Sequence, residues 1–288
     1  MIWALLTIFG NATEQILIGY FILQTDPLNA VPFFYLLTSL FCIATPIALG
    51  FRNGHPMDLL SEKKLVFIFV FASASGNALW FSALCLWGLS GTALVLIALR
   101  VILIFYGTYF LKEKMAAKQW FAAVMIIGLL ALFTNATPPE NTTGVILAFL
   151  SVILYAIEDI TEKALSSRVE PTHLMSLRQI VALILFTIVA LLVNKSISFE
   201  FLSQPKLAIS IVVAAFIGGP LVCHARFYAY RALPISLFSL ISSFKPVLIV
   251  VGSMIFLGEE MTNLQMILAA MMLAITPLLN KPSVNTPN

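Results

Sequence analysis

The chain has 288 residues, of which 60% are hydrophobic and only 10% charged, and its mean hydropathy is +1.01. Soluble domains average roughly 45–50% apolar and about 25% charged residues, so this composition excludes a soluble globular protein. The net charge of +3 comes without the clustered basic patch that nucleic-acid binding requires. Cys42, Cys85 and Cys223 lie far apart in apolar runs, so no metal site or disulfide framework is expected.

The apolar segments follow one another with short polar breaks that cannot hold a soluble domain. Roughly 20 helical residues cross a hydrocarbon core, and a helix satisfies its own backbone hydrogen bonds in lipid. No basic segment precedes the first apolar run, which favours a membrane helix over a signal peptide. The sequence predicts an all-α integral membrane protein with ten transmembrane helices, at residues 2–23, 30–50, 65–86, 92–111, 120–134, 144–165, 174–193, 207–230, 235–257 and 264–279.

The distribution of Lys and Arg over the breaks predicts the orientation. Basic residues gather in cytoplasmic loops of membrane proteins, and ten of them fall on the side of the amino terminus against two on the other. Both termini are therefore predicted to be cytoplasmic. The ten are Arg52, Lys63, Lys64, Lys112, Lys114, Lys118, Lys163, Arg168, Arg231 and Lys281, and the two are Lys195 and Lys206.

A weak internal repeat divides the chain in two. Residues 110–120 read FLKEKMAAKQW and residues 256–266 read FLGEEMTNLQM, so that Phe, Leu, Glu, Met and Gln coincide. If helices one to five repeat as six to ten, the odd number places the second copy in the opposite orientation. Inverted repeats of this kind are common in secondary transporters, with the substrate site near the bilayer midplane between the halves.

These features resemble the EamA-like branch of the drug/metabolite transporter superfamily. The matching residues are the turn Leu257-Gly258-Glu259 and Pro246 within the ninth predicted helix. The first half departs from the pattern, because Lys112 replaces the glycine before Glu113 and the fourth helix has no proline. The resemblance implies two five-helix repeats, 1–137 and 138–288, with helices one, three, four, six, eight and nine around a central cavity. It also implies a multi-pass protein of the bacterial inner membrane.

Charged residues within the predicted spans fall on a subset of these helices. A charge at mid-bilayer costs at least about 2.5–3.5 kcal/mol on insertion scales, so it indicates function or a tight partner. Helix seven carries only Arg178, close to its end, where snorkelling to the interface explains it. The other charges lie on helices one, four, six, eight and nine and are Glu14, Arg100, Glu158, Asp159, His224, Arg226 and Lys245.

Two interpretations of these charges remain open. Arg100 and Lys245 are candidates to bind a carboxylate or phosphate, or they neutralise nearby carboxylates. A desolvated carboxylate can titrate near neutrality, so the candidates for a coupling proton are Glu14, Glu158, Asp159 and His224; the alternative is permanent ion pairing. Glu158 and Asp159 are about 100° apart on a helix, so only one of the two is expected to face the cavity.

Further polar and aromatic residues complete the predicted substrate site. Each has a structural alternative, since buried amides bond across helices and aromatic rings pack in apolar surroundings. The full set of predicted substrate-binding residues is Asn11, Glu14, Asn77, Trp80, Arg100, Tyr155, Glu158, Arg226 and Lys245. Helix-breaking residues Gly218, Gly219, Pro220 and Pro246 are predicted hinges, with ordinary tolerance of Gly and Pro in membrane helices as the alternative.

The sequence as a whole indicates an alternating-access carrier of a small polar organic metabolite, with an amino acid or another zwitterion or anion favoured. The alternatives are a carrier of a cationic or nucleoside-type metabolite and a non-transporting receptor or assembly subunit. An enzyme is not expected, because the chain lacks His-Glu-x-x-His and Gly-x-Ser-x-Gly. The expected partners are a small-molecule substrate, the lipid bilayer and a coupling proton. No nucleic acid, cofactor or metal is expected, and the protein is expected to be a monomer or homodimer.

Overall fold

The chain is a bundle of apolar helices, seen in a computed structural model that describes residues 1–48, 57–110, 117–135, 141–193, 200–233, 238, 241–242, 244–276 and 278. No strand occurs within these residues, which confirms the all-helical prediction. The helices of the first part are α1 (Ile2–Gln24), α2 (Pro27–Ala48), the short α3 (Met57–Ser61), α4 (Lys63–Trp87), α5 (Leu89–Phe110) and α6 (Ala117–Asn135).

The second part continues the alternation of helices and tight turns. It holds α7 (Thr142–Leu165), α8 (Pro171–Leu192), η2 (Glu200–Ser203), the run α9 (Pro205–Phe216), η3 (Ile217–Val222) and α10 (Cys223–Ala232), then α12 (Lys245–Gly252), η4 (Ser253–Leu257) and α13 (Asn263–Ile275).

Six helices of the described chain are long and apolar enough to cross a membrane: α1, α4, α6, α7, α8 and the continuous run from α9 to α10. The other four predicted spans coincide with shorter apolar helices in α2, α5, α12 and α13. The count of ten spans and the cytoplasmic placement of the termini therefore remain predictions. Several charges behind the orientation, including Arg52, Lys195 and Lys281, lie outside the described residues, as does Lys112-Glu113-Lys114 of the repeat.

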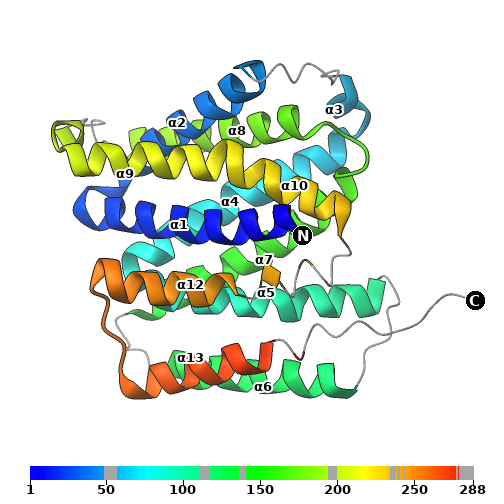
Figure 1. The fold of residues 1–288 in the computed structure, drawn as a ribbon, viewed down its shortest axis with the longest axis vertical. Helices are drawn as coiled ribbons and strands as arrows, with labels where there is room; N and C mark the ends of the chain where they lie inside the picture. Colours follow the sequence, from blue (N-terminus) through cyan, green and yellow to red (C-terminus); the bar gives the residue numbers. More distant parts are fainter. Residues whose placement is uncertain are drawn as a thin grey trace, which may run out of the picture.

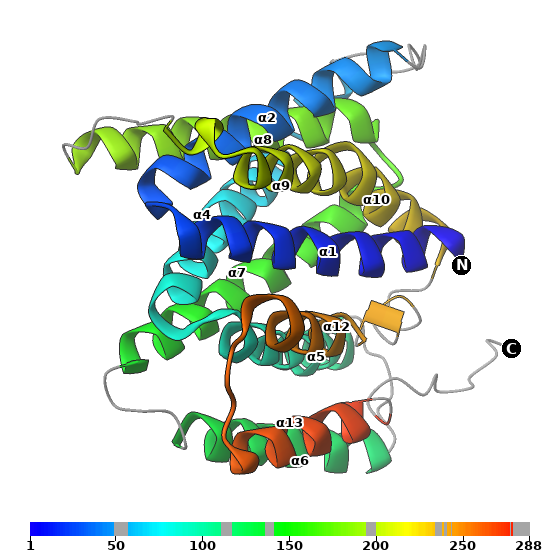
Figure 2. The same ribbon diagram turned by 60° about the vertical axis from the view of Figure 1, so that its left-hand side comes forward.

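The helices pair in a pattern that an inverted repeat would produce. The predicted repeat relates α1 to α7, α2 to α8, α4 to the run α9–α10, α5 to α12 and α6 to α13. Three of these pairs, α2 with α8, α5 with α12 and α6 with α13, pack directly against each other. The two helix pairs that do not pack on their own copies exchange partners under the repeat, since α4 packs on α7 and α1 packs on α9–α10. Figures 1 and 2 show the α6–α13 pair as an outer layer, with the α5–α12 pair between it and the rest.

Proline and glycine residues shape the second half in two ways. Gly218, Gly219 and Pro220 lie in η3, a π-helical segment between α9 and α10, so the interruption predicted in this span is present. The sequence places Pro246 inside a helix that covers 235–257, but α12 begins at Lys245 and Pro246 lies in its first turn. A proline is tolerated there because the first N–H groups of a helix have no intrahelical acceptor. In the described residues Pro246 therefore stands at the start of α12, and its role as a hinge remains a prediction.

Small residues allow close approach between helices of the two halves. A Cβ atom at Gly252 of α12 would overlap Cδ1 of Ile16 on α1, and one at Gly76 of α4 would lie 3.2 Å from the Tyr155 ring on α7. In lipid, helix association depends on such van der Waals contact because no hydrophobic force acts between helices. Gly128 of α6 is different, since nothing lies within 4 Å of the position its Cβ would take.

We expect Gly252→Val to destabilise the protein by about 1–3 kcal/mol, because overpacking forces α1 and α12 apart. Gly128→Val on the open surface of α6 is the matched control and should change stability by less than about 0.5 kcal/mol. Thermal unfolding of both variants in the same detergent checks this. Equal melting temperatures for the two variants would show that the α1–α12 contact carries no such constraint.

Candidate functional site

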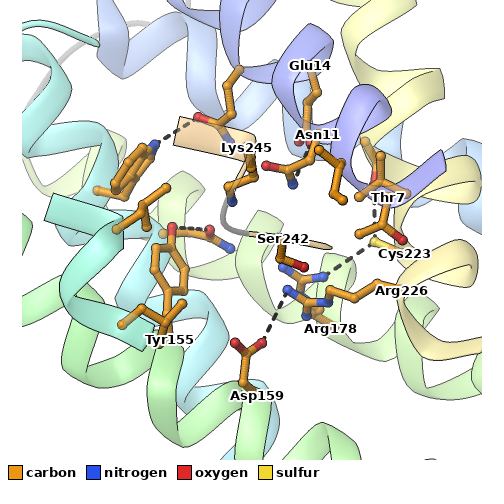
Figure 3. A pocket seen from close by; sticks show the side chains of 18 of the residues that line it. Thr7, Asn11, Glu14, Tyr155, Asp159, Arg178, Cys223, Arg226, Ser242 and Lys245 are labelled. Atoms are coloured by element: carbon orange, nitrogen blue, oxygen red, sulfur yellow. Dashed lines mark hydrogen bonds and ion pairs between the residues drawn. The ribbon is translucent and has the colours of Figure 1, made fainter. Parts of the chain in front are cut away.

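A polar cavity of about 100 Å³ lies between the two halves of the bundle. The first half contributes α1, α2, α4 and α5, and the second contributes α7, α8, η3, α10, α12 and residues 238 and 242. Space for one water corresponds to roughly 10–15 Å³ on this measure, so the cavity has room for a small organic molecule. Figure 3 shows side chains from these helices converging on one space.

A buried cluster of carboxylates and guanidinium groups borders the cavity, which is lined by its arginines Arg178 and Arg226. Glu158 and Glu162 are four residues apart on α7 and therefore share one helix face. Nη2 of Arg226 contacts both carboxylates, and Nη2 of Arg178 lies 3.2 Å from Oε1 of Glu158. Both glutamates are fully buried. An isolated charge in such a place would be very costly, so each group depends on its partners.

Asp159 extends this cluster into the cavity. It lines the cavity whereas Glu158 does not, and its Oδ1 lies 4.0 Å from Nη1 of Arg226 (Figure 3). This is the division that the spacing of about 100° between adjacent helical residues predicts. Arg100 of α5 also lines the cavity and is 7% exposed, so it too is held in a buried environment.

Arg178 differs from its sequence interpretation. The sequence predicts a side chain that snorkels to the interface, but Arg178 lines the cavity and pairs with the buried Glu158. Its Nε also donates to Oγ of Ser73 on α4, and its Nη1 lies 3.4 Å from Sγ of Cys223. The correction follows from packing: α8 contacts both α4 and α10, so this end of α8 faces protein instead of lipid.

Two further charged side chains face the cavity without forming an ion pair. Glu14 of α1 has one weak hydrogen bond in the described structure, from Nδ2 of Asn11 at 3.4 Å. Lys245, at the start of α12, has no carboxylate within 4 Å among the described residues. Both line the cavity, and Figure 3 shows the Lys245 side chain extending into it. These two opposite charges are therefore available to a ligand.

Space for the Glu14 carboxylate depends on the absence of a side chain at Gly218. A Cβ there would overlap Oε1 of Glu14. Gly218 is part of the π-helical segment η3, whose carbonyls are partly satisfied by side chains that follow it: Sγ of Cys223 donates to Gly218 O at 3.1 Å, and Nδ1 of His224 lies 2.8 Å from Pro220 O. The interruption thus opens room for a charge beside the helix.

Polar atoms without partners also line the cavity. Oδ1 of Asn11, Oε1 of Gln179 and Oγ of Ser242 are buried and have no hydrogen-bond partner in the described part of the chain. Gln179 and Ser242 are each only 5% exposed. Buried polar groups in proteins are almost always hydrogen-bonded. A polar ligand could supply the missing partners, as a donor to the two amide oxygens and as a donor or acceptor to the Ser242 hydroxyl.

The aromatic residues form a second wall. Nε1 of Trp80 donates to Oε1 of Gln15 at 2.9 Å, and the Tyr155 hydroxyl donates to Oδ1 of Asn77 at 2.9 Å. The two rings lie 6.0 Å apart. Trp80 is 2% exposed, so most of its ring packs in the core and only part of it faces the cavity. Asn77 and Tyr155 are fixed in place across the α4–α7 contact.

The structure brings most of the predicted site residues together. Eight of the nine predicted substrate-binding residues line the cavity, and Glu158 lies directly behind it. Of the other proton and hinge candidates, Asp159 and Gly218 line it, whereas His224, Gly219, Pro220 and Pro246 do not. Sequence reasoning missed Arg178, Gln179, Glu162, Gln15 and Tyr35. Glu162 follows Glu158 by one helical turn, and this spacing was the available signal.

The fold and the cavity define a multi-pass integral membrane protein with a polar site enclosed by apolar helices. Residues 142–280 match the model of the EamA-like transporter family, which identifies the second half of the chain as EamA-like and confirms the resemblance seen in the sequence. This match suggests a membrane transporter of the drug/metabolite transporter superfamily.

The fold also matches solved structures. One of them, a crystal structure of a protein that is 16% identical, aligns with a TM-score of 0.65 over 94% of this chain and 95% of that chain. At this identity the likeness concerns the fold alone. No curated protein gives a match to the chain.

We expect Arg226→Met to destabilise the protein by about 3–5 kcal/mol, because it leaves Glu158 and Glu162 buried without their shared cation. Arg168→Ala is the control: Arg168 pairs with Glu62 at the surface at 3.0 Å and is 52% exposed, so its loss should cost at most about 1 kcal/mol. Chemical or thermal unfolding in detergent measures both. Restoring stability in a triple variant with Glu158→Gln and Glu162→Gln would confirm the cause, and an equal effect of Arg168→Ala would contradict it.

Proposed function

We propose that the protein is a secondary active transporter that carries a small polar organic metabolite, with a zwitterion such as an amino acid favoured. The observation that supports this best is the pair Glu14 and Lys245, two opposite charges that face one cavity and have no ion-pair partner within 4 Å in the described structure. The other cavity charges are engaged with each other or held in buried contacts.

A zwitterion fits this distribution of charge. Its ammonium group can pair with Glu14 and its anionic group with Lys245, while Asn11, Gln179 and Ser242 supply hydrogen bonds. A simple cation would leave Lys245 without a partner in a low-dielectric site, and a simple anion would do the same to Glu14. The ligand thereby completes a set of buried charges that the protein alone leaves incomplete.

Alternating access is the proposed mechanism, and the repeats 1–137 and 138–288 are the proposed moving halves. The cavity lies between them, so rocking of one half against the other would expose it to each side in turn. The π-helical segment with Gly218, Gly219 and Pro220 lies beside Glu14 and is the proposed hinge. A proton is the proposed coupling ion, with Glu14, Glu158, Asp159 and His224 as candidates, and the bacterial inner membrane is the proposed location.

A carrier of a cationic or nucleoside-type metabolite is the second candidate. Asp159 and Glu14 line the cavity together with the rings of Trp80 and Tyr155, and an aromatic face attracts cations. This candidate requires that Lys245 stay outside the binding contacts, which separates it from the first. An assembly subunit, or a receptor for another kind of ligand, would bind none of the metabolites.

The test is thermal stability in detergent against anionic, zwitterionic and cationic metabolites. A ligand at about 100 times its dissociation constant should stabilise the protein by about 2.7 kcal/mol. We expect zwitterions to raise the melting temperature, and Glu14→Gln or Lys245→Gln to remove the shift. Lys206→Gln, at an exposed position of α9, is the matched control and should keep it.

The other outcomes are equally specific. Stabilisation by cations alone that survives Lys245→Gln would favour the cationic carrier over the zwitterion carrier. No shift with any class would contradict the carrier and favour the receptor or assembly role.

A further inference from the structure

The bundle is sealed at the end where α1 finishes and α5 begins. A Cβ at Gly19 of α1 would lie 3.0 Å from Cδ2 of Leu89 and 3.4 Å from Cδ1 of Leu257. Leu89 is fully buried, and so are Ala93 and Leu94 in the next turn of α5. The first α5 residue that lines the cavity is Leu96. Apolar side chains of α1, α5 and η4 therefore separate the cavity from this end.

Glu259 holds this closure together by binding the first turn of α5. Its Oε1 accepts a hydrogen bond from the Leu89 N–H at 2.6 Å, and its Oε2 accepts one from the Ser90 N–H at 2.7 Å. The first N–H groups of a helix have no intrahelical acceptor, and the helix dipole favours a negative charge there. Both carboxylate oxygens are thus used in charge-assisted hydrogen bonds, the stronger kind in proteins.

The neighbouring residues are arranged to permit this contact. Gly258 has φ +67 and turns the chain directly after η4, which aims Glu259 back at α5. Gly88 has φ +84, and a Cβ there would lie 3.0 Å from Oε1 of Glu259. Between α5 and η4, the hydroxyls of Ser90 and Ser253 also form a buried hydrogen bond of 2.5 Å. Two glycines and two serines therefore surround one glutamate.

This contact joins the two halves of the chain, since α5 belongs to the first and the turn after η4 belongs to the second. A rocking motion that moves α5 away from η4 and the turn after it breaks both bonds of Glu259. The adjacent Glu260 is exposed and makes no such contact in the described structure. Of the two neighbouring glutamates only Glu259 binds α5 in the described structure, so Glu260 provides a matched control.

We propose that Glu259 is a gate latch, a positioning residue that holds the cavity shut at the α5 end and so sets how often that face opens. By the predicted orientation this is the external face. The proposal rests on the alternating-access function proposed above, and it assigns a role to the Leu-Gly-Glu turn that the substrate site does not use.

The experiment measures access to the cavity with a membrane-impermeant methanethiosulfonate reagent. The reporter is the thiol introduced by Leu96→Cys in a Cys85→Ser background, because Cys85 is the exposed native thiol. The same background without Leu96→Cys corrects for the buried thiols. Right-side-out and inside-out vesicles present each face of the membrane separately. A second thiol, introduced by Lys206→Cys, shows which vesicles present the latch face. Lys206 lies at this end of the bundle because Phe201 of the neighbouring η2 contacts Phe21 near the end of α1.

We expect Glu259→Ala to raise the labelling rate of the reporter thiol from the latch face by about tenfold or more, because two charge-assisted hydrogen bonds are lost. Glu260→Ala should label at the parent rate. Gly88→Ala, which displaces the carboxylate, should act in the same direction as Glu259→Ala, and Ser253→Ala should do so more weakly. These two variants test the latch if Glu259→Ala does not fold.

Two results would overturn the latch. Equal labelling of the Glu259→Ala and Glu260→Ala proteins would show that the contact does not control opening, and equal acceleration from both faces would show general loosening. Because labelling needs no substrate, the two proposals fail separately. Ligand binding with unchanged labelling would remove the latch alone, whereas a latch effect with no ligand of any class would remove the carrier alone.

Discussion

The structure depends on the buried ion pairs between α7 and α10. A charge in the middle of an apolar bundle is tolerated only beside its counter-charge, and Arg226 meets this condition by contacting Glu158 and Glu162 together. Arg178 adds the link to α8 and, through Ser73, to α4. Four helices are thereby fixed around one group of charges. Their positions determine the shape of the adjacent cavity, and the charges make its lining polar.

The ion pairs of α7 also determine which cavity charges are left for a ligand. Arg178 and Arg226 pair with the glutamates of α7, and in the described structure neither of them forms an ion pair with Glu14 within 4 Å. Glu14 approaches η3 where Gly218 leaves room for it, and Lys245 enters from the first turn of α12. A site with one carboxylate and one ammonium group left over is matched to a ligand that carries both charges.

Different turns of α5 contribute to the latch and to the cavity. Its first turn is bound by Glu259, its next turns are buried in apolar packing, and Leu96, Leu99 and Arg100 face the cavity. The same rigid helix therefore connects closure at one end to the lining of the site. Displacement of α5 relative to the turn after η4 would alter both, which is a physical route from gating to binding that needs no intermediate element.

The membrane class, the helical architecture and the family resemblance all follow from the sequence alone, because they depend on run lengths, composition and short motifs. The sequence also places most cavity residues on the correct helices, since charges in apolar segments must face protein. How those charges are distributed among partners is a property of the packed bundle. Sequence reasoning assigns Arg178 to the interface, because pairing across helices is set by packing and has no local signature. Glu162 did have a local signal, its spacing of four residues from Glu158 on α7, and was overlooked. The bond from Glu259 to α5 spans 170 residues, and a contact of that separation exists only once the helices have met.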